Sequence, residues 1–342
     1  MKETEQVAGG GEATRDAGKK AMRGSLLLVL GAMIWGAAFT AQRAGMDHLG
    51  PFSFSAIRML LGGIVMIPVA AWTEKKRKAA GPEGVAAPGT ETAKTARTGR
   101  LSLWNRLSTQ QKAGLLCGLF LFAANSLQQQ GLVYTSAGKA GFLTALYVVL
   151  VPVAGVVLFG KRTGWPVWTG VGMAVVALFL LCVPAEGFRL EAGDLLVIGC
   201  AVCFTGQILC VDHYAPYVNG AALARDEFLV TGLLSLPVAL LTETITWEGI
   251  RGAMIPILYT GILSCAVGYT LQIIGQRDVN PTVASLLMCL ESVFAVLTGT
   301  LVLGERMTVR EGIGCVLMLS AVILAQLGPR IMERRKTGRE KD

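Results

Sequence analysis

A glutamate in the middle of a long apolar stretch is the first residue in this sequence whose chemistry calls for an explanation. Glu291 lies near the centre of residues 282–303. An ionised carboxylate at the centre of a bilayer costs about 2.5–3.5 kcal/mol on insertion scales, so we expect Glu291 to face the protein interior or to carry a proton. It could act as a proton carrier or as the counter-ion of a substrate amine. A structural carboxyl group bonded between helices is the alternative, and we favour the functional role.

Helical spacing supports an inward-facing Glu291, because residues three or four positions apart share one face of a helix. Its face carries small or polar residues, among them Ala284, Met288 and Thr298. The apolar segment 141–160 carries Tyr147 at the matching place. The tyrosine ring could hold a cation and its hydroxyl could form a hydrogen bond, but packing alone explains it equally well.

Two pairs of polar residues also have helical spacing. Asn125 and Gln128 are three positions apart, and Tyr269 and Gln272 have the same spacing. Each pair therefore lies on one helix face. Uncharged amides bind both carboxylate and ammonium groups, which suits a zwitterion. They also hold membrane helices together for about 0.6–2 kcal/mol each, and we weigh these two interpretations equally.

Three further residues are candidates for the lining of a cavity. Trp35 stands well inside its apolar segment, away from the interface where tryptophan gathers. Gln207 occupies the sixth segment at the position that matches Phe39. Bundle packing is the more common role of such a tryptophan. Arg58 could attract a substrate carboxylate or could extend its side chain to interfacial water, and we favour the second role.

The composition requires that these residues work inside a membrane. Hydrophobic residues make up 53% of the 342 residues and charged residues 16%, whereas an ordinary soluble domain carries about 25% charge. A membrane-spanning helix needs about 20 apolar residues. The sequence therefore predicts an all-α integral membrane protein with ten transmembrane helices, at 25–44, 52–72, 113–133, 141–160, 164–183, 192–211, 227–243, 253–274, 282–303 and 311–328.

The positions of Lys and Arg indicate how the chain is oriented. Of the 31 such residues, 24 lie in the tails and loops that an even number of crossings places on one side, and five lie in the loops of the other side. We therefore predict that both termini and the long loop 73–112 are cytoplasmic. The net charge of +8 is a topology signal, assisted by attraction to anionic membrane lipid, and does not indicate a nucleic-acid partner.

The chain contains an internal repeat. Shifted by 144 positions, residues 127–162 match residues 271–306 with ten identities, including Gln128 with Gln272. The first segments of each half align less well, at an offset near 168, and the second segments share a Pro-Val-Ala sequence that starts at Pro68 and at Pro237.

This repeat predicts the domain organisation. Two repeats, 25–183 and 192–328, lie between tails at 1–24 and 329–342. Five segments in each half require the second half to enter the membrane from the opposite side, so the repeats are inverted. Inverted repeats are typical of secondary transporters that bind substrate near the bilayer midplane.

Three stretches carry a family resemblance: GAMIWGAAFTAQRAG (31–45), QQGLVYTSAGKAGFLTALYVVLVPVAGVVLFGKR (129–162) and LESVFAVLTGTLVLGER (290–306). They resemble the EamA family of the drug/metabolite transporter (DMT) superfamily, ten-span permeases built from two five-span repeats. In the third stretch Glu291 matches a characteristic acidic residue, whereas the first repeat departs from that pattern with Tyr147 and Lys161. The resemblance covers about 25–328 and implies transport of small metabolites, often amino acids or their relatives.

Residues that other function classes need are missing from the sequence. Both histidines lie in loops, the Cys200/Cys203 pair has no second pair to complete a metal site, and there is no nucleophile elbow or phosphate-binding loop. We therefore expect no enzyme activity, no metal and no cofactor.

We predict a permease or exporter in the plasma (inner) membrane that moves a small organic metabolite by alternating access, as a monomer or homodimer. Proton exchange at Glu291 is the candidate driving step. A flippase for lipids or lipid-linked sugars, with the same fold, stays the alternative.

Overall fold

The computed structural model describes residues 2–79, 106–135, 137–160, 164–183, 191–302 and 307–339, and within these ranges it contains helices and no strand. Residues 80–105 of the predicted cytoplasmic loop lie outside the described ranges. The first half contains α1 Lys2–Met46, α2 Pro51–Ala79, α4 Thr109–Tyr134, α5 Ala137–Thr144, α6 Tyr147–Phe159 and α7 Trp165–Cys182. The second half contains α8 Ala192–Tyr214, α9 Gly220–Thr242, α10 Trp247–Gly252, α11 Met254–Leu258, η1 Tyr259–Tyr269, α12 Thr270–Gln276, α13 Pro281–Met288, α14 Leu290–Val302 and α15 Val309–Arg339.

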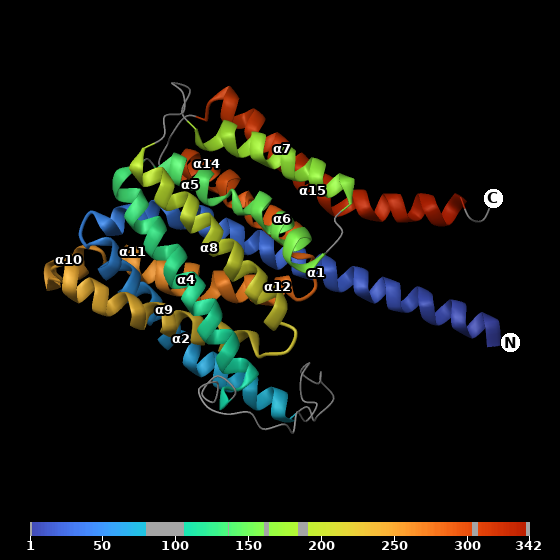
Figure 1. Ribbon diagram of the computed structural model, residues 1–342, viewed down its shortest axis with the longest axis horizontal. Coiled ribbons are helices and arrows are strands. Elements are labelled where there is room, and N and C mark those ends of the chain that lie inside the picture. Colours follow the sequence, from blue (N-terminus) through green and yellow to red (C-terminus); the bar gives the residue numbers. More distant parts are fainter. Residues whose placement is uncertain are drawn as a thin grey trace.

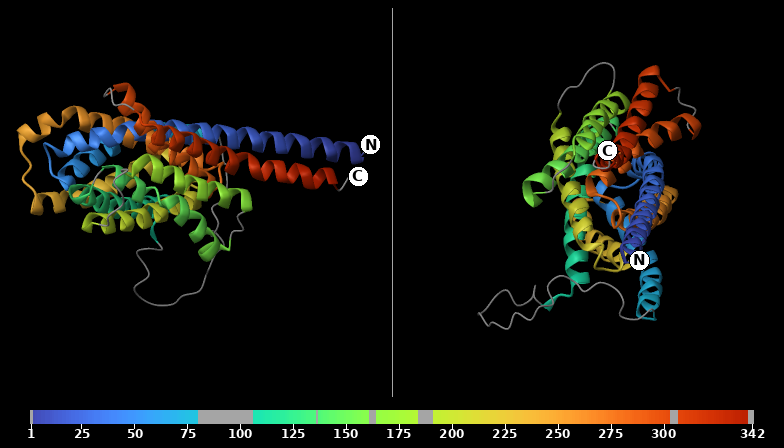
Figure 2. Two further views of the ribbon diagram at one scale, coloured as in Figure 1. Left: turned by 90° about the horizontal axis from the view of Figure 1, so that it is seen from above. Right: turned by 90° about the vertical axis from the view of Figure 1, so that its right-hand side faces the viewer.

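The long helices form one bundle, and the two ends of the chain leave it on the same side (Figure 1). The start of α1 and the end of α15 extend beyond the bundle on the same side, as the left view of Figure 2 shows. The short helix α10 lies at the opposite end of the bundle. Termini on one side agree with an even number of crossings.

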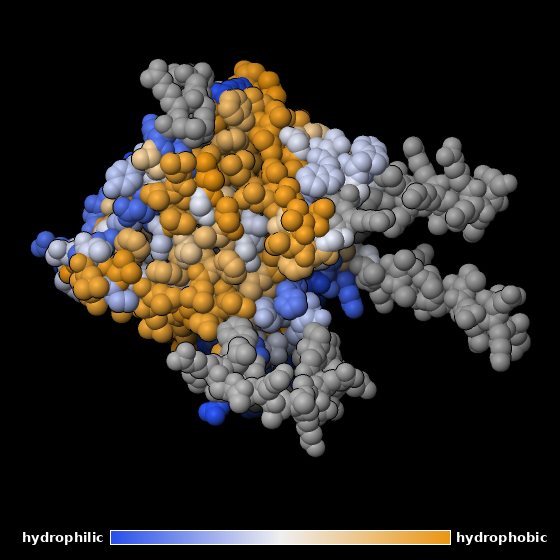
Figure 3. Space-filling view, viewed as in Figure 1, coloured by the Kyte–Doolittle hydropathy of each residue, from blue (hydrophilic) through white to orange (hydrophobic). Residues whose placement is uncertain are grey.

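The surface of the bundle is that of a membrane protein. Apolar residues cover its middle, and hydrophilic residues gather toward its two ends (Figure 3). Leu241, Leu301 and Ile255 are more than four-fifths exposed, and many other large apolar side chains of the bundle are exposed with them. An exposed apolar surface of this extent indicates contact with a membrane. Eight helical stretches in the described residues are long and apolar enough to cross a membrane. This protein is therefore a multi-pass membrane protein.

Two of the ten predicted spans do not belong to these eight stretches. They correspond to α4, with 26 residues, and α9, with 23 residues. At 1.5 Å per residue both are longer than the roughly 30 Å of the hydrocarbon core. They are less apolar because they carry glutamines, Asn125 and the run Arg225–Glu227. α4 packs against α8 and α9, and α9 packs against α2, so protein covers much of their polar surface.

The predicted span 227–243 starts too late. Helix α9 begins at Gly220, where the side chain of Asn219 accepts hydrogen bonds from the backbone amides of Ala221 and Ala222 at 3.0 and 3.4 Å. An apolar count rejects this first part because it ends with two charged residues, Arg225 and Asp226. Asn219 supplies the cap that starts the helix, and Glu227 consequently lies within α9.

Three predicted spans are helical but irregular. The span 141–160 divides into α5 and α6 with a turn at Ala145–Leu146, and 282–303 divides into α13 and α14 at Cys289. The Cys289 thiol lies 3.8 Å from the Ala145 carbonyl oxygen, so the two breaks touch. The span 253–274 includes the 11-residue π-helix η1. Irregular backbone at membrane depth is tolerated where it lines a cavity or is buried in protein.

Close helix contacts occur in matching pairs in the two halves. A Cβ on Gly63 would come within 2.7 Å of Leu229, and a Cβ on Gly232 within 2.7 Å of Leu60. Gly232 and Leu229 each stand 169 positions after Gly63 and Leu60. The contacts between α2 and α9 are therefore reciprocal.

The outer helices repeat this pattern. A Cβ on Gly24 would lie 2.7 Å from the Gly275 carbonyl oxygen, and one on Gly193 would lie 2.8 Å from the Gly131 carbonyl oxygen. Gly24 and Gly193 are again 169 positions apart. The packing thus matches α1 to α8 at an offset of 169 positions, one more than the offset near 168 that the sequence comparison gave. The register is fixed by the glycines that permit the close approach of the helices.

Candidate functional site

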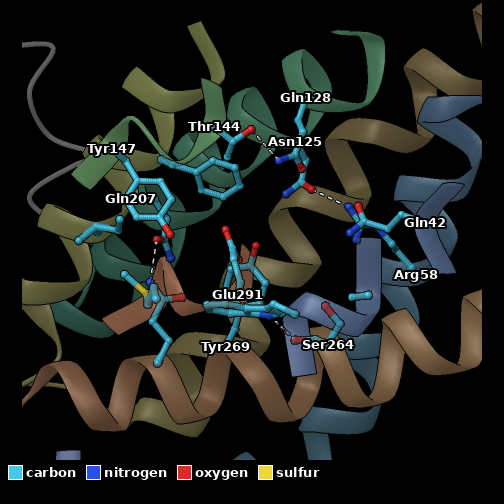
Figure 4. Close-up of a pocket in the computed structure, with 16 residues that line it drawn as sticks. Gln42, Arg58, Asn125, Gln128, Thr144, Tyr147, Gln207, Ser264, Tyr269 and Glu291 are labelled. Atoms are coloured by element: carbon cyan, nitrogen blue, oxygen red, sulfur yellow. Dashed lines mark hydrogen bonds between the residues drawn. The ribbon is translucent and has the colours of Figure 1, made fainter. Parts of the chain in front are cut away.

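A pocket of about 70 Å³ lies inside the bundle. One water molecule needs about 10–15 Å³ on this measure, so the pocket has room for a small ligand that displaces about five to seven waters. Figure 4 shows Arg58 on one side of it, Tyr147 and Gln207 on the other, and Glu291 between them. The lining residues are Trp35, Ala38, Gln42, Arg58, Asn125, Gln128, Thr144, Tyr147, Phe204, Gln207, Ile208, Ser264, Tyr269, Gln272, Met288 and Glu291.

Both halves of the chain contribute equally to this lining, and most members form pairs at equivalent positions. Helices α4 to α6 supply Asn125, Gln128, Thr144 and Tyr147, and their counterparts 144 positions later also line the pocket. These counterparts are Tyr269, Gln272, Met288 and Glu291. Trp35 and Ala38 of α1 also have counterparts in the lining, Phe204 and Gln207 of α8, which stand 169 positions later. The pocket therefore lies between the two halves.

Tyr147 and Glu291 meet at the breaks in the helices. Tyr147 is the first residue of α6, and Glu291 lies in the first turn of α14. The Tyr147 hydroxyl interacts with the Glu291 carboxyl group, which is 8% exposed. The positive end of the α14 dipole lies next to this carboxyl group and favours negative charge there.

Arg58 places a cation in the same pocket. Its side chain is 3% exposed, and its Nη2 donates a hydrogen bond of 2.6 Å to Asn125 Oδ1. The guanidinium carbon lies 5.7 Å from the centre of the Phe54 ring. The Nε atom is buried without a hydrogen-bond partner, and no ion pair to Arg58 occurs in the described part of the chain. The predicted extension of Arg58 to interfacial water is therefore wrong, because Asn125 holds the side chain inside.

Amide side chains connect the pocket to a second carboxyl group. Gln272 Nε2 donates to Gln207 Oε1 at 3.2 Å, and Gln207 Nε2 donates to Glu227 Oε2 at 3.3 Å. Gln272 Oε1 and Glu227 Oε1 are buried and have no partner. On the α5 side, Gln128 Nε2 donates to Thr144 Oγ1 at 3.1 Å. Gln272 therefore has an acceptor free for a ligand.

The aromatic residues form one wall. Trp35 Nε1 donates to the Ser264 carbonyl oxygen at 3.1 Å, and its ring packs edge-on against Tyr269 with centroids 4.9 Å apart. Ser264 and Tyr269 both belong to η1. A π-helix brings residues five positions apart to the same side, which places both residues at the pocket.

All eight residues predicted for the site line this pocket, which is a statement of position and not of function. Sequence reasoning missed Gln42 and Ser264 and misplaced Arg58. Gln42 follows Trp35 by seven positions, on the same helix face, and accepts a hydrogen bond of 2.7 Å from Gln129, so helical spacing could have found it. Nothing in the sequence reveals Ser264, because its position depends on η1.

The side chains of this pocket are suited to binding a small polar ligand. The pocket holds one buried cation, one buried carboxyl group, several amides and an aromatic wall. Within the described ranges, no three His, Cys, Asp or Glu side chains are grouped so that they could hold a metal ion.

The model of the EamA-like transporter family matches this chain twice, at residues 22–183 and 191–327. An uncharacterised transporter of Archaeoglobus fulgidus is 28% identical over 91% of this chain and 88% of its own length. The uncharacterised transporter YwfM of Bacillus subtilis is 22% identical over 90% of this chain and 94% of its own length.

A relative with a stated substrate covers less of the chain. The threonine/homoserine exporter RhtA of Escherichia coli K12 is 28% identical over 54% of this chain and 61% of its own length. One crystal structure superimposes with a TM-score of 0.70 over 91% of this chain and 98% of the other, at 19% identity. That likeness concerns the fold alone.

Proposed function

Because this chain belongs to the EamA-like transporter family, we propose that it is a secondary transporter that moves a small organic metabolite across the cell membrane by alternating access. The observation that carries the proposal is the pocket between the two halves, with an unpaired buried cation and a buried carboxyl group in its wall. The pocket lies within one chain, so a monomer suffices and a homodimer is not required. The chain acts as a carrier and not as an enzyme.

The transport model has ten crossings in two inverted repeats, 25–183 and 192–328. Helices α4 and α9 complete the eight more apolar crossings. The reciprocal contacts of Gly63 with Leu229 and of Gly232 with Leu60 support a twofold relation between the halves. The termini lie on one side of the bundle. In the proposed topology they are cytoplasmic, together with most of the Lys and Arg residues.

The substrate in this proposal is a zwitterion of the size of a small amino acid. Its carboxylate pairs with Arg58, whose Nε lacks a partner. Its ammonium group is bound by Gln272 Oε1 and Glu291. The side chains of Trp35, Asn125, Gln128, Tyr147, Gln207 and Tyr269 complete the site. Partial similarity to RhtA, a threonine/homoserine exporter, makes L-threonine the first compound to test.

Proton exchange at Glu291 drives transport in this proposal. A carboxyl group that binds the ammonium group when ionised releases it when protonated, so substrate and proton compete for one site. Transport of this kind is antiport. The Glu291→Gln variant keeps a similar shape and hydrogen-bonding capacity but cannot exchange a proton.

The experiment measures exchange of radiolabelled L-threonine in proteoliposomes with and without a pH gradient. We expect wild-type protein to exchange the label faster under a gradient, and the Glu291→Gln variant to fold but lose the response to the gradient. A wild-type response in that variant refutes the proton-exchange role. If wild-type protein moves no amino acid but scrambles labelled lipid, the flippase alternative replaces the carrier.

A further inference from the structure

Glu227 is a buried carboxyl group that the proposed transport cycle does not use. It is 0% exposed, and among the side chains that the structure describes its hydrogen-bond partner is Gln207, which lines the pocket. Its Oε1 atom has no partner. Glu227 is thus outside the pocket but one side chain away from it, and intramembrane carboxyl groups are functional candidates by default.

The repeat explains why Glu227 is present and why it is separated from the pocket. Glu227 stands 169 positions after Arg58, the same spacing that relates the matched glycines of α2 and α9. Each half therefore has an ionisable residue at this place, with opposite charge. On α1 the small residue Ala38 and on α2 Arg58 itself both line the pocket. At the equivalent position α8 has Gln207, which lies between Glu227 and the pocket.

From this geometry we infer that Glu227 is a proton-dependent positioning residue, which sets through Gln207 whether Gln272 offers the substrate a hydrogen-bond acceptor or a donor. The inference rests on the proposed transport function and concerns the same site. It assigns Glu227 no direct contact with the substrate.

The direction of the hydrogen bonds follows from the chemistry of the three side chains. An ionised carboxylate can only accept, so Gln207 turns its Nε2 to Glu227 and its Oε1 to Gln272. Gln272 then uses its Nε2 for Gln207 and leaves its Oε1 free. This is the observed arrangement, and it offers an acceptor to the ammonium group of a substrate.

Protonation of Glu227 reverses the direction of these hydrogen bonds. The carboxylic acid donates a hydrogen bond to Gln207 Oε1 after the Gln207 amide turns over. The Gln272 amide turns over as well, so that Gln207 Nε2 donates a hydrogen bond to Gln272 Oε1. Gln272 is left with a free Nε2, which is a donor and repels an ammonium group. The proton is taken up from water and returned to water, and no covalent bond other than the O–H bond changes.

Several titratable groups surround Glu227. Helix α9 packs against α2, α4, α12 and η1. The groups that interact with Glu227 are Asp226 on α9 itself, Cys210 on α8, Cys117 on α4, and Cys265 and Tyr269 on η1. Arg58 on α2 interacts electrostatically with Cys265 and Tyr269, the same two residues with which Glu227 interacts.

The test measures the affinity of purified protein for L-threonine from about pH 5 to about pH 9. All proteins carry Glu291→Gln, so that the titration of Glu291 does not contribute. This change weakens binding of the ammonium group by the same factor at every pH, because glutamine keeps an acceptor oxygen but has no charge to titrate. We expect affinity to fall about 10-fold or more toward low pH, the worth of one hydrogen bond to a charged group. Glu227→Gln should abolish this pH dependence, and so should Gln207→Met, which leaves Glu227 intact but interrupts the relay.

The matched control is Asp226→Asn. Asp226 is the preceding residue of the same helix and pairs with Arg225 and Gln110, away from the pocket. We expect this variant to keep the pH dependence. If Glu227 only stabilises the fold, Glu227→Gln changes the affinity by the same factor at every pH, and the inference is overturned.

A second measurement separates this inference from the proposed function. Infrared difference spectra of the substrate-free protein report protonation of buried carboxyl groups directly. We expect a titrating carboxyl band that is absent in Glu227→Gln and shifted in Gln207→Met. If L-threonine does not bind but this band is present, the substrate assignment fails and the switch stands. If no band distinguishes wild type from Glu227→Gln, the switch itself is refuted.

Discussion

Replacing Arg58 with methionine should separate substrate binding from folding. Methionine keeps an unbranched side chain in the pocket and removes the charge. The guanidinium group is 3% exposed and has Asn125 as its hydrogen-bond partner. Removing one member of a buried charge pair costs about 2–5 kcal/mol. We therefore expect the affinity for L-threonine to fall by about 30-fold to several thousand-fold.

Stability should change much less than affinity. The variant loses the hydrogen bond to Asn125, worth about 1.5–3 kcal/mol, and the contact with the Phe54 ring, worth about 0.5–1 kcal/mol. It gains the desolvation free energy of an unpaired cation, which amounts to several kcal/mol. Because these contributions oppose each other, we expect the free energy of unfolding to change by less than about 2 kcal/mol.

The assay combines equilibrium binding of radiolabelled L-threonine with thermal unfolding of the same preparations. Arg225→Met on α9 is the control, because Arg225 forms an ion pair of 2.6 Å with Asp226 outside the pocket. This control should bind as wild type does. Wild-type affinity in Arg58→Met would refute the assignment of Arg58 to the substrate carboxylate, and a large loss of stability without weaker binding would make Arg58 a structural residue.

Three further predictions concern helix packing and helix capping. A Cβ on Gly36 would lie 2.6 Å from the Glu291 carbonyl oxygen, so Gly36→Ala should force α1 away from α14 and lower stability by about 1–3 kcal/mol. Gly172→Ala has open space at its Cβ and should stabilise α7 by about 0.5–1 kcal/mol; thermal unfolding compares the two, and an equal effect would contradict the close contact. Asn219→Ala removes the cap of α9 and should cost about 1 kcal/mol, whereas unchanged unfolding would mean that the cap contributes nothing.

Much of the site was predictable because helical periodicity and duplication leave marks in the sequence. Glu291 and Tyr147 share an offset of 144 positions, and the same offset relates Gln128 to Gln272. Residues on the axis between two similar halves approach their own counterparts. A match between polar residues at a constant offset therefore locates an interface before any coordinate is known.

The errors in placing Arg58 and Glu227 arise from contacts between helices, which a count of apolar residues does not detect. Arg58 was expected at the interface, because the sequence does not show that Asn125 will hold it at 2.6 Å. The predicted span in α9 began at Glu227 and so placed this residue at the end of the span, because the sequence does not show that a partner from another helix will bury its carboxyl group. Gln207 is that partner.

By itself, the sequence determined that this protein crosses a membrane many times, that it consists of two similar halves, and that a few polar residues lie within its membrane-spanning segments. These properties follow from local composition and spacing. Only the tertiary structure decided that the helices break at Ala145 and Cys289, that η1 brings Ser264 to the pocket, and that a relay of amides leads to Glu227. Such features depend on contacts between distant segments, and their free energies exist only once those segments meet.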